Sequence, residues 1–180
     1  FKYNPALANQ IISEELEKVG AEKINGLWYY NEEQIEITFF IRSDDPVRKS
    51  IGEILSSELE RVGFKVNKDY GDLNKAFVVV YGSNPKDQKW HIYTEGWGSS
   101  GFAKYDSVGL AQMYSPWFSN MPGNNDPTYW NYKNDYIDSI TKKIYVSDFA
   151  SAEERSMLIK QATKEGVSES VRIFLASKTD

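Results

Sequence analysis

The chain contains no cysteine, a single histidine and no long apolar run. Without cysteine it can form no disulfide and offers no thiolate ligand to a metal ion, although this absence leaves the cellular compartment open. The single histidine, His91, lies in a strand-like segment between Trp90 and Ile92, and one histidine without clustered partners does not make a metal site. No apolar run approaches the length of about 20 residues that crosses a bilayer. We therefore expect neither a metal site nor a transmembrane helix.

Charge of one sign is not concentrated anywhere in the chain. The 21 basic and 26 acidic residues are interspersed and give a net charge of −5. A nucleic-acid partner would need a basic patch, which this pattern lacks. Motifs of covalent catalysis and phosphate binding are also missing: there is no Gly-x-Ser-x-Gly elbow, P-loop or Gly-x-Gly-x-x-Gly. Glu95 and Asp126 could imitate a glycosidase pair, but nothing in the sequence fixes their separation. We expect no enzymatic activity, no catalytic residue and no cofactor.

What the chain does contain is a pattern typical of a βαβ crossover. Residues 34–42 alternate and are rich in β-branched and aromatic side chains, which indicates a strand. Asp45 and Pro46 form a helix start, since aspartate caps the first turn and proline lacks only an N–H that this turn does not use. Helix capping also explains why Asp44 and Asp45 are adjacent. Gly63 can supply the left-handed C-cap.

Between these caps the apolar residues recur at helical spacing, and a second strand starts at Phe64. A crossover of this kind makes a parallel sheet, whose ligand sites lie at the carboxyl ends of its strands. We predict an α/β fold with one apolar helix stripe, made of Val47, Ile51, Ile54, Leu55, Leu59 and Val62.

Other elements follow from caps and periodicity. We predict a helix over about residues 5–18, capped by Asn4 and Gly20, and a hairpin between residues 27–30 and the strand from Gln34. The apolar residues expected to point inward from the first helix are Leu7, Ile11, Leu16 and Val19. Near the end, Asn134 caps a helix that carries Ile137, Ile140 and Ile144, and a capping box at Ser151 opens a helix to about Val167. Strands are expected at residues 90–95 and 172–176. Residues 71–81 fit a strand by propensity and a helix by spacing.

Residues 96–132 are the candidate ligand-binding segment. They follow a predicted strand end, show little periodicity, and combine many aromatic side chains with short polar ones. So many aromatic residues argue against disorder, and this mixture suits an amphipathic ligand. Two ordinary explanations remain open: Trp117 and Phe118 could plug the loop onto the core, and Trp130 with Tyr132 could form a hydrophobic staple.

Several stretches also occur in the order typical of one family of transport proteins. They are residues 3–20, which begin Tyr-Asn-Pro after Lys2; residues 41–66, whose helix ends Leu-x-x-x-Gly-Phe-Lys-Val; residues 90–97, which end Gly-Trp; residues 131–138, which follow Asn-Tyr-x-Asn-x-x-x-Asp; and the helix start at residues 152–155. In these stretches the chain resembles the oligopeptide/dipeptide/nickel-type solute-binding proteins of ABC importers, extracellular solute-binding protein family 5. The resemblance also favours a helix at residues 71–81.

The resemblance implies a three-layer α/β lobe of a type II-like periplasmic binding protein, with a mixed sheet that includes the βαβ crossover. Family members have two lobes and are much longer, so we expect residues 1–180 to be a single domain, a second-lobe (C-terminal) fragment of a larger protein. A start at Phe1 without an initiator methionine, and a strand close to the other end, agree with that expectation. A mature, processed single domain is the alternative.

The function implied is capture of peptides or a related oligomeric solute and its delivery to a membrane permease, without chemistry. The partners would be the solute, the missing first lobe and the ABC permease. The location would be extracellular or periplasmic, with membrane association through the parent protein, as in a lipoprotein. A carbohydrate-active module that uses the aromatic segment is the alternative from another class.

The resemblance points to Trp97 in the Gly-Trp motif as a ligand contact, together with residues of the aromatic segment. The expected ligand-binding residues are Trp97, Ser99, Ser100, Tyr105, Trp117 and Trp130. Peptide-binding members often carry an aspartate three residues after this tryptophan, where it pairs with the amino terminus of the peptide. Here that residue is Ser100, which can accept a hydrogen bond but supplies no charge. This difference favours a neutral ligand such as an oligosaccharide.

Overall fold

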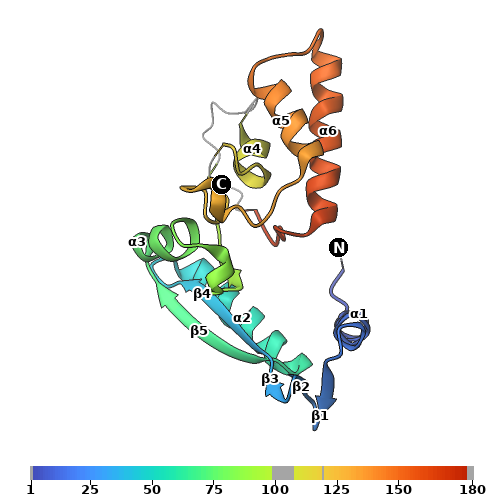
Figure 1. Cartoon of the computed structure of the whole chain (residues 1–180), viewed down its shortest axis with the longest axis vertical. Helices are drawn as coiled ribbons and strands as arrows, with labels where there is room; N and C mark the ends of the chain where they lie inside the picture. Colours follow the sequence, from blue (N-terminus) through green and yellow to red (C-terminus); the bar gives the residue numbers. More distant parts are fainter. Residues whose placement is uncertain (1, 99–107, 119, 178–180) are drawn as a thin grey trace. The chain divides into compact units, whose positions relative to one another are not determined.

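The computed structural model describes residues 2–98, 108–118 and 120–177 (Figure 1). The chain divides into two compact units, and it passes between them more than once. The first unit comprises Phe1–Ala76 and Lys89–Gly96, and the second comprises Phe77–Gln88 and Trp97–Asp180. The prediction that residues 1–180 form a single second-lobe domain stays a prediction.

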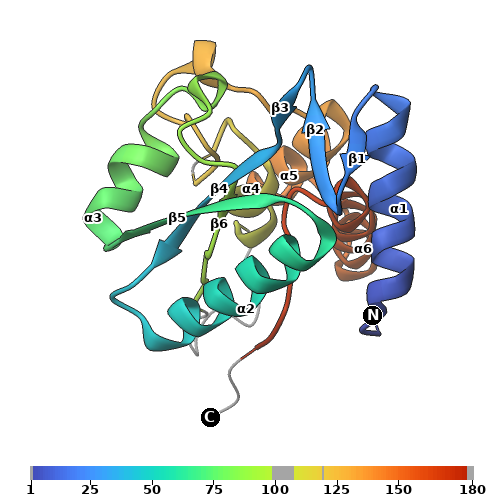
Figure 2. The same cartoon turned by 90° about the horizontal axis from the view of Figure 1, so that it is seen from below.

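The first unit is built on the expected βαβ crossover. Strand β4 (Glu36–Arg42) pairs in parallel with β5 (Lys65–Gly71), and helix α2 (Pro46–Val62) connects them. Strand β6 (Ile92–Tyr93) pairs in parallel with the other edge of β4, so the order is β5-β4-β6. Figure 2 shows α2 running along the sheet, in agreement with its contacts to β4 and β5. The predicted α/β class and the parallel neighbours of β4 are confirmed.

Helix α2 begins and ends as predicted, and four residues of its predicted stripe, Ile51, Leu55, Leu59 and Val62, are half-buried. Asp45 accepts hydrogen bonds from the first-turn amides, and Gly63 adopts φ 111° at the C-cap. Its fully buried residues are the small ones, Gly52 and Ser56. Val47 and Ile54 of the predicted stripe are 65% and 60% exposed, so their inward assignment was wrong. The reason is close packing: a Cβ added at Gly52 would lie 2.6 Å from Cγ2 of Ile41, so small residues face the sheet.

The predicted strand from Gln34 is divided between two sheets. Strands β1 (Glu22–Ile24), β2 (Leu27–Tyr30) and β3 (Glu33–Gln34) form an antiparallel sheet, and β4 starts one residue after Ile35. The expected hairpin is confirmed, and its turn residues Asn31 and Glu32 both have positive φ, which matches a two-residue primed turn. Antiparallel and parallel strands are therefore both present, in separate three-stranded sheets.

Trp28 of β2 joins the hairpin to the crossover. Its side chain is fully buried, and its Nε1 donates to the carbonyl of Val62 at 3.0 Å. The backbone N–H of Trp28 donates to the carbonyl of Gly63. Lys23 lies over the indole ring at 5.1 Å from its centroid. These contacts attach the antiparallel sheet to the end of α2.

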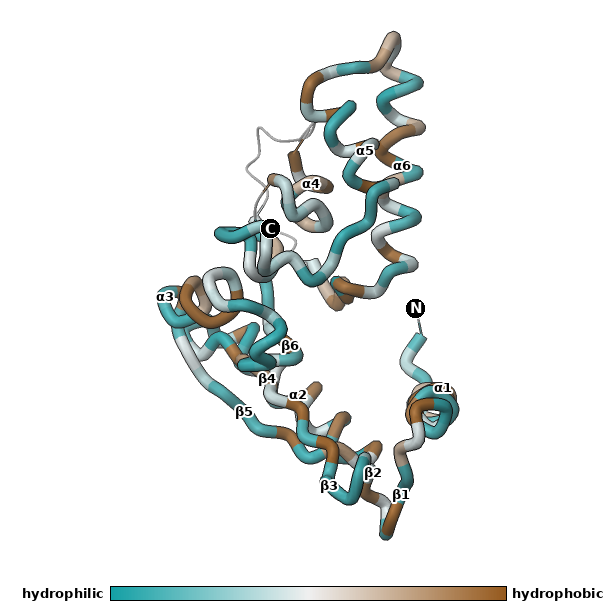
Figure 3. The backbone as a smooth tube through the Cα atoms, viewed as in Figure 1, coloured by the Kyte–Doolittle hydropathy of each residue, from teal (hydrophilic) through white to brown (hydrophobic). Residues whose placement is uncertain are grey.

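Helix α1 (Pro5–Lys18) is capped by Asn4 as predicted, but its apolar residues are not buried. Leu7, Ile11 and Val19 are 48%, 49% and 63% exposed, and only Leu16 is half-buried. The inward assignment was therefore wrong for three of the four. Figure 3 shows the apolar positions of α1 among hydrophilic ones. The spacing is amphipathic, but no part of the described chain covers this face, so tertiary packing does not follow from periodicity here.

Residues 73–81 are helical, as the resemblance favoured over strand propensity, whereas Gly71 is the last residue of β5. Helix α3 (Leu73–Ala76) is followed directly by a π-helical turn, η1 (Phe77–Tyr81). Val80 and Tyr81 are buried in the second unit. The valine-rich run is thus accommodated by the wider π-helical turn. A short 3₁₀ turn, η2 (Pro85–Asp87), follows.

The second unit contains α4 (Gly109–Tyr114), the 3₁₀ turn η3 (Pro127–Tyr129), α5 (Asp135–Tyr145) and α6 (Ala152–Glu169). Asn134 and Ser151 cap α5 and α6 as predicted. The three isoleucines of α5 are buried, which confirms their assignment, and the apolar cluster between α4, α5 and α6 consists of Ile140, Ile144 and Ala162 with Leu110, Leu158 and Ile159. Gly166 of α6 allows close approach, because an added Cβ would lie 2.6 Å from the ring of Tyr114.

The predicted strand at residues 172–176 is absent, because residues 172–177 adopt no regular structure. Ile173 and Phe174 are 76% and 56% exposed. A strand exists only when another strand pairs with it, and within the described residues none pairs with this segment. The predicted strand at residues 90–95 is reduced to the two residues of β6.

Candidate functional site

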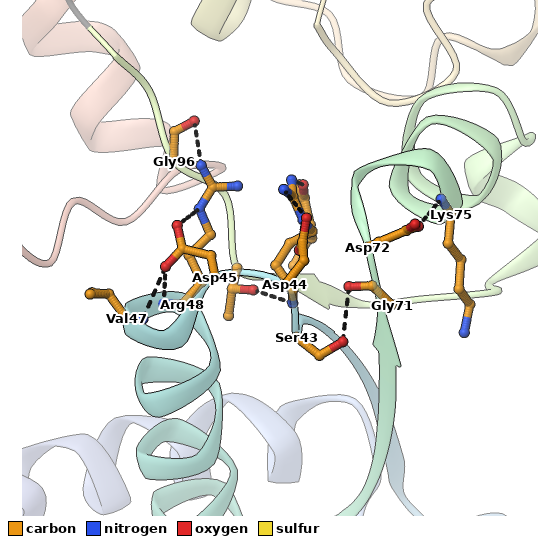
Figure 4. Close-up of polar contacts among 12 residues, drawn as sticks. Ser43, Asp44, Asp45, Val47, Arg48, Gly71, Asp72, Lys75 and Gly96 are labelled. Carbon is orange, nitrogen blue, oxygen red and sulfur yellow. Dashed lines mark hydrogen bonds and ion pairs between the residues drawn. The ribbon is translucent and has the colours of Figure 1, made fainter.

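The carboxyl ends of β4, β5 and β6 meet at one edge of the parallel sheet, which we call the carboxyl edge (Figure 4). Arg42 is paired with Gly71, and the N–H of Ser43 donates to the carbonyl of Gly71 at 2.9 Å. On the other side, the backbone N–H of Arg42 donates to Oγ1 of Thr94 at 2.9 Å. In parallel sheets this edge is where ligands bind, since loops rather than crossover helices meet there.

Arg42 is the most buried charged residue of the carboxyl edge, with 7% of its surface exposed. Its Nε and Nη2 donate to the two oxygens of Asp44 at 2.7 and 2.9 Å, and its Nη1 donates to the hydroxyl of Tyr93 at 3.2 Å. The bidentate contact holds the pKa of Asp44 below its usual value and raises the pKa of Arg42. Asp44 is thus an ion-pair partner, and only Asp45 of the predicted capping pair caps the helix.

Arg48 connects the start of α2 to the chain beyond β6. Its Nε lies 3.3 Å from Oδ2 of Asp45, and its Nη2 donates to the carbonyl of Gly96 at 3.3 Å. A Cβ added at Gly96 would lie 2.4 Å from Nη2 of Arg48, so only glycine fits against this guanidinium without a shift. Gly96 is the last residue of the first unit before Trp97. Arg48 therefore positions the segment that leads into the Gly-Trp motif.

Asp72 and Lys75 occupy the β5 side of the same edge. Oδ1 of Asp72 accepts from the N–H of Lys75 at 2.9 Å, and Nζ of Lys75 donates to the carbonyl of Tyr70 at 3.1 Å and to Asp69. Lys75 also lies over the ring of Phe40 at 5.4 Å from its centroid. The three cations described at the carboxyl edge, Arg42, Arg48 and Lys75, are therefore each paired with an aspartate.

His91 was expected inside a strand and lies one residue before β6. Its N–H donates to the carbonyl of Thr38 at 2.8 Å, and its Nδ1 accepts from the N–H of Thr38 at 2.8 Å. The histidine thus continues the β4–β6 ladder. Nowhere in the described part of the chain is there a group of three or more histidine, cysteine or acidic residues that could hold a metal ion.

Trp97 is the first residue of the second unit after Gly96, and it is half-buried. The guanidinium carbon of Arg172 lies over its indole ring, 5.4 Å from the centroid. The Nε1 of Trp97 is buried and has no hydrogen-bond partner among the described residues. Trp97 thus combines a stacked ring with a donor that is available for a ligand or a water molecule.

Trp117 belongs to an aromatic cluster formed with Phe118 and Tyr145. The three ring centroids are 5.5–5.6 Å apart in edge-on arrangements, and Lys142 lies over Trp117 at 5.7 Å. This packing against α5 agrees with the structural explanation that was left open for Trp117 and Phe118. The Nε1 of Trp117 is nevertheless buried without a partner in the described chain.

Trp130 is the C-cap residue of η3, where its N–H donates to the carbonyl of Pro127. Its own Nε1 is likewise a buried donor without a partner in the part of the chain that the structure describes. Ser99, Ser100 and Tyr105 lie outside the described residues. Of the six expected ligand-binding residues, Trp97, Trp117 and Trp130 therefore share one feature, an unsatisfied indole N–H in the second unit.

A group of buried polar side chains lies on or beside α4 and α5, where these helices pack with α6. Tyr114 is 1% exposed and Asp138 is 6% exposed, and both carry a buried oxygen that no described residue pairs with. Burial raises the pKa of Asp138, and burial with nearby Glu169 raises the pKa of Tyr132 to about 12. Ser115 and Thr141, also buried, bond to each other at 2.9 Å. Buried polar groups usually have partners, so these oxygens are suited to hold internal water.

Asp126 is poorly suited to act as a catalytic acid. Its Oδ1 accepts from the N–H and the hydroxyl of Thr128 at 2.9 and 2.8 Å, and these bonds hold its pKa below the usual value. A glycosidase acid needs a raised pKa, so Asp126 is unsuited to that role.

No helix within the described residues is both long and apolar enough to cross a membrane.

The sequence did not lead us to Arg42, Arg48 or Arg172 as important positions. Two signals were present: Arg42 closes a strand just before two aspartates, and Arg48 follows the cap Asp45 at i+3. For Arg172 there was no local signal. Its partners are separated from it by more than 50 residues along the chain.

No protein-family model matches the chain, and no curated protein matches it significantly. Solved structures do match in fold. NikZ from Campylobacter jejuni in complex with Ni(L-His) superposes with a TM-score of 0.65 and 19% identity over 90% of this chain. The oligopeptide-binding protein AppA from Bacillus subtilis in complex with a nonapeptide gives 0.64 and 19% over 91%. The periplasmic binding protein MelB from Agrobacterium fabrum in complex with stachyose gives 0.64 and 17% over 91%.

These similarities establish a shared fold. The α/β structure with its parallel sheet matches the fold of periplasmic binding proteins. The chain spans 29% of NikZ, 29% of AppA and 24% of MelB, so it corresponds to a part of each. The ligands named for these neighbours are a nickel chelate, a peptide and an oligosaccharide.

Proposed function

We propose that this chain is the ligand-binding second lobe of an extracellular solute-binding protein of an ABC importer, of family 5. In this proposal it captures a peptide or a related oligomeric solute and delivers it to a membrane permease without chemistry. Its partners are the solute, a first lobe and the permease. The protein acts outside the cell or in the periplasm, held at the membrane through the parent protein.

The observation that carries the proposal is the fold similarity over 90–91% of the chain to three proteins that each bind a small solute. Motif order in the sequence supports the same family independently. Because the chain spans less than a third of each neighbour, it would supply one side of a cleft that closes around the solute by hinge motion.

The proposed contacts are Trp97, Trp117 and Trp130, together with Ser99, Ser100 and Tyr105, which lie outside the described residues. The three indole N–H groups are buried donors without partners among described residues, and a buried donor without a partner costs about 1–3 kcal/mol. A solute or ordered water that accepts from them would recover that free energy. Aromatic faces next to a few donors suit a solute with both apolar and polar surface.

An oligosaccharide is the second candidate ligand within the same proposal. It is favoured by Ser100, which stands where peptide-binding members often carry an aspartate, and by the stachyose complex of MelB. A carbohydrate-active enzyme is less well supported, since the hydrogen bonds to Asp126 lower the pKa of that carboxyl.

The test is a thermal-shift screen of the protein encoded by the whole reading frame that contains this chain, against short peptides and neutral oligosaccharides. A solute that raises the melting temperature in a dose-dependent manner supports the proposal, because ligand bound to the native state stabilises it. Substitution Ser100→Asp should strengthen binding of a peptide with a free amino terminus and leave a neutral sugar unchanged or weakened. Turnover of a saccharide without retention of it would contradict the proposal.

A further inference from the structure

We propose that Asn25 is a site of spontaneous deamidation, and that the isoaspartate formed there loosens the turn between β1 and β2. This modification goes beyond the proposed function, because it requires neither a solute nor the second unit.

Asn25 is the only asparagine of the chain that is followed by glycine. Asparagine is a thermolabile residue, because the backbone nitrogen of the next residue can attack its side-chain carbonyl carbon. A side chain on that next residue hinders closure of the five-membered ring, and glycine has none. Among the asparagines of this chain, Asn25 therefore has the most reactive neighbour.

The reaction proceeds in two steps and consumes one water molecule. The backbone nitrogen of Gly26 bonds to Cγ of Asn25, the Cγ–Nδ2 bond breaks, and Nδ2 leaves as ammonia with the former backbone proton. Water then adds to one of the two carbonyl carbons of the succinimide and returns a proton to the ring nitrogen. Attack at Cγ yields aspartate, and attack at the backbone carbonyl carbon yields isoaspartate, whose main chain is longer by one methylene group.

The folded hairpin leaves both reacting groups free. Asn25 and Gly26 are exposed. Among the described residues, nothing accepts from the N–H of Gly26 or bonds to the side-chain amide of Asn25. A Cβ added at Gly26 would meet nothing within 4 Å, so no neighbouring group blocks the approach to its backbone.

The remaining barrier is conformational. Asn25 and Gly26 have φ of 51° and 84°, as a two-residue primed turn requires. Ring closure needs a rotation about the Cα–C bond of Asn25, so the turn must open first. Strand β1 has three residues, all exposed, and it lies at the edge of its sheet. Opening the turn therefore disrupts few contacts.

An isoaspartate does not fit this turn. The two-residue loop fixes the pairing of Ile24 with Leu27, and an additional methylene group in the main chain disturbs that register. The carbonyl of Gly26 also lies against Gly63, where an added Cβ would be 2.5 Å from its oxygen. The carbonyl of Gly63 accepts from the N–H of Trp28 at 2.9 Å. The lengthened turn therefore weakens contacts that hold the hairpin against the end of α2.

The second turn of the same sheet is a matched control within the chain. Asn31 and Glu32 connect β2 to β3, are both exposed, and have φ of 50° and 68°. The asparagine thus has the same left-handed conformation, but no glycine follows it. Cleavage after Lys23 and Arg42 releases both turns in one peptide, so both asparagines are measured with equal recovery.

The first experiment incubates the protein from the whole reading frame in mildly alkaline buffer. Mass spectrometry with fragmentation that separates aspartate from isoaspartate follows both asparagines. We expect Asn25 to deamidate several-fold faster than Asn31, with isoaspartate among its products. Gly26→Asn, which keeps a residue that tolerates positive φ, should slow the reaction at Asn25 several-fold. Glu32→Gly should accelerate the reaction at Asn31 several-fold.

The second experiment measures the consequence for the hairpin by amide hydrogen exchange. In the incubated wild type, exchange of the amides of β1 and β2 should become several-fold faster as isoaspartate accumulates. Gly26→Asn, incubated for the same time, should keep its initial exchange rates.

Equal rates at Asn25 and Asn31, or an unchanged rate at Asn25 in Gly26→Asn, would overturn the modification site. A fully converted protein with unchanged exchange in β1 and β2 would overturn the loosening of the turn. Neither measurement involves a solute, so a failure here is distinguishable from a failure of the proposed function.

Discussion

At the scale of single residues, Trp97 allows the most direct test of the proposed ligand binding. It follows directly on a glycine that Arg48 holds in place, its ring is stacked by Arg172, and its indole donor is unpaired within the described residues. Each neighbour orients the side chain, and an aromatic residue with fixed orientation loses little entropy when a solute stacks on it.

Replacing Trp97 by alanine should weaken solute binding by about 1–3 kcal/mol, the range for losing a stacked aromatic anchor. Titration calorimetry on the protein from the whole reading frame measures this change. Tyr136→Ala, which removes an aromatic side chain that is 49% exposed on α5, serves as the matched control and should leave the affinity unchanged. A Trp97→Ala protein that unfolds several degrees earlier yet binds the solute unchanged, where folded, would move the site elsewhere.

Asp138 is a buried carboxyl whose pKa is raised, mainly by burial. A raised native pKa means that the protonated form is favoured by folding. The contribution of protonated Asp138 to the free energy of unfolding is fully present below the unfolded pKa of about 3.9. It is lost as the pH rises through the native pKa of this carboxyl. The variant Asp138→Asn should therefore be more stable than the wild type at pH 7, and this advantage should shrink toward pH 4. Urea denaturation at both pH values measures the difference.

Asp135→Asn provides a control of the opposite sign for Asp138. Asp135 is exposed, and its contact with Lys133 lowers the pKa of its carboxyl. Its small contribution is present above the unfolded pKa and is lost as the pH falls through the lower native value. A destabilised Asp138→Asn at pH 7 would show that the carboxylate makes contacts worth more than its burial costs.

At the scale of elements, α2 illustrates how small residues decide which part of an apolar helix face packs most closely. The helix lies close to β4 because Gly52 and Ser56 face the sheet, while Ile54 points to solvent. Close approach increases the number of favourable dispersion contacts around Ile41, which is fully buried.

The substitution Gly52→Ala should therefore destabilise the protein despite its better helix propensity. Propensity favours alanine by about 1 kcal/mol, but the added Cβ would lie 2.6–2.9 Å from three side-chain carbons of Ile41. Overpacking of this kind costs about 1–3 kcal/mol, so we expect a net loss of up to about 2 kcal/mol in the free energy of unfolding. Gly98→Ala is the matched control, since a Cβ there meets nothing within 4 Å. Equal stability of both variants would refute the packing argument.

At the scale of the whole molecule, the chain corresponds to less than a third of each similar binding protein. A cleft needs surfaces on both sides, because ligand sites enclose most of the surface of the ligand. Apolar residues on α1 and after α6 are also exposed, and nothing within the described residues covers them.

These 180 residues alone should bind a transported solute with a Kd worse than about 1 mM, near −4 kcal/mol. The protein from the whole reading frame should bind the same solute far more tightly. Calorimetry on both proteins with one solute from the thermal-shift screen makes the comparison. Micromolar binding by the 180 residues would show that they contain a complete site.

The sequence by itself determined the local features of this protein. Caps and spacing placed α1, α2, α5 and α6 within a few residues, and the strand–helix–strand pattern was sufficient for the parallel pairing of β4 with β5. These features depend on neighbours within a few turns, where backbone geometry and capping dominate. The strand at residues 172–176 failed for the same reason, because local β propensity cannot supply a pairing partner.

Only the tertiary structure decided which faces are buried and which side chains meet. It exposed Ile54 and the apolar residues of α1, and it brought Arg172 onto Trp97 and Arg48 onto Gly96. Such contacts join residues far apart in the chain, and their free energy depends on distances of a few tenths of an ångström that no periodicity encodes. The sequence could therefore indicate the tryptophans of the candidate site, but the arginines that orient it became visible only in the folded chain.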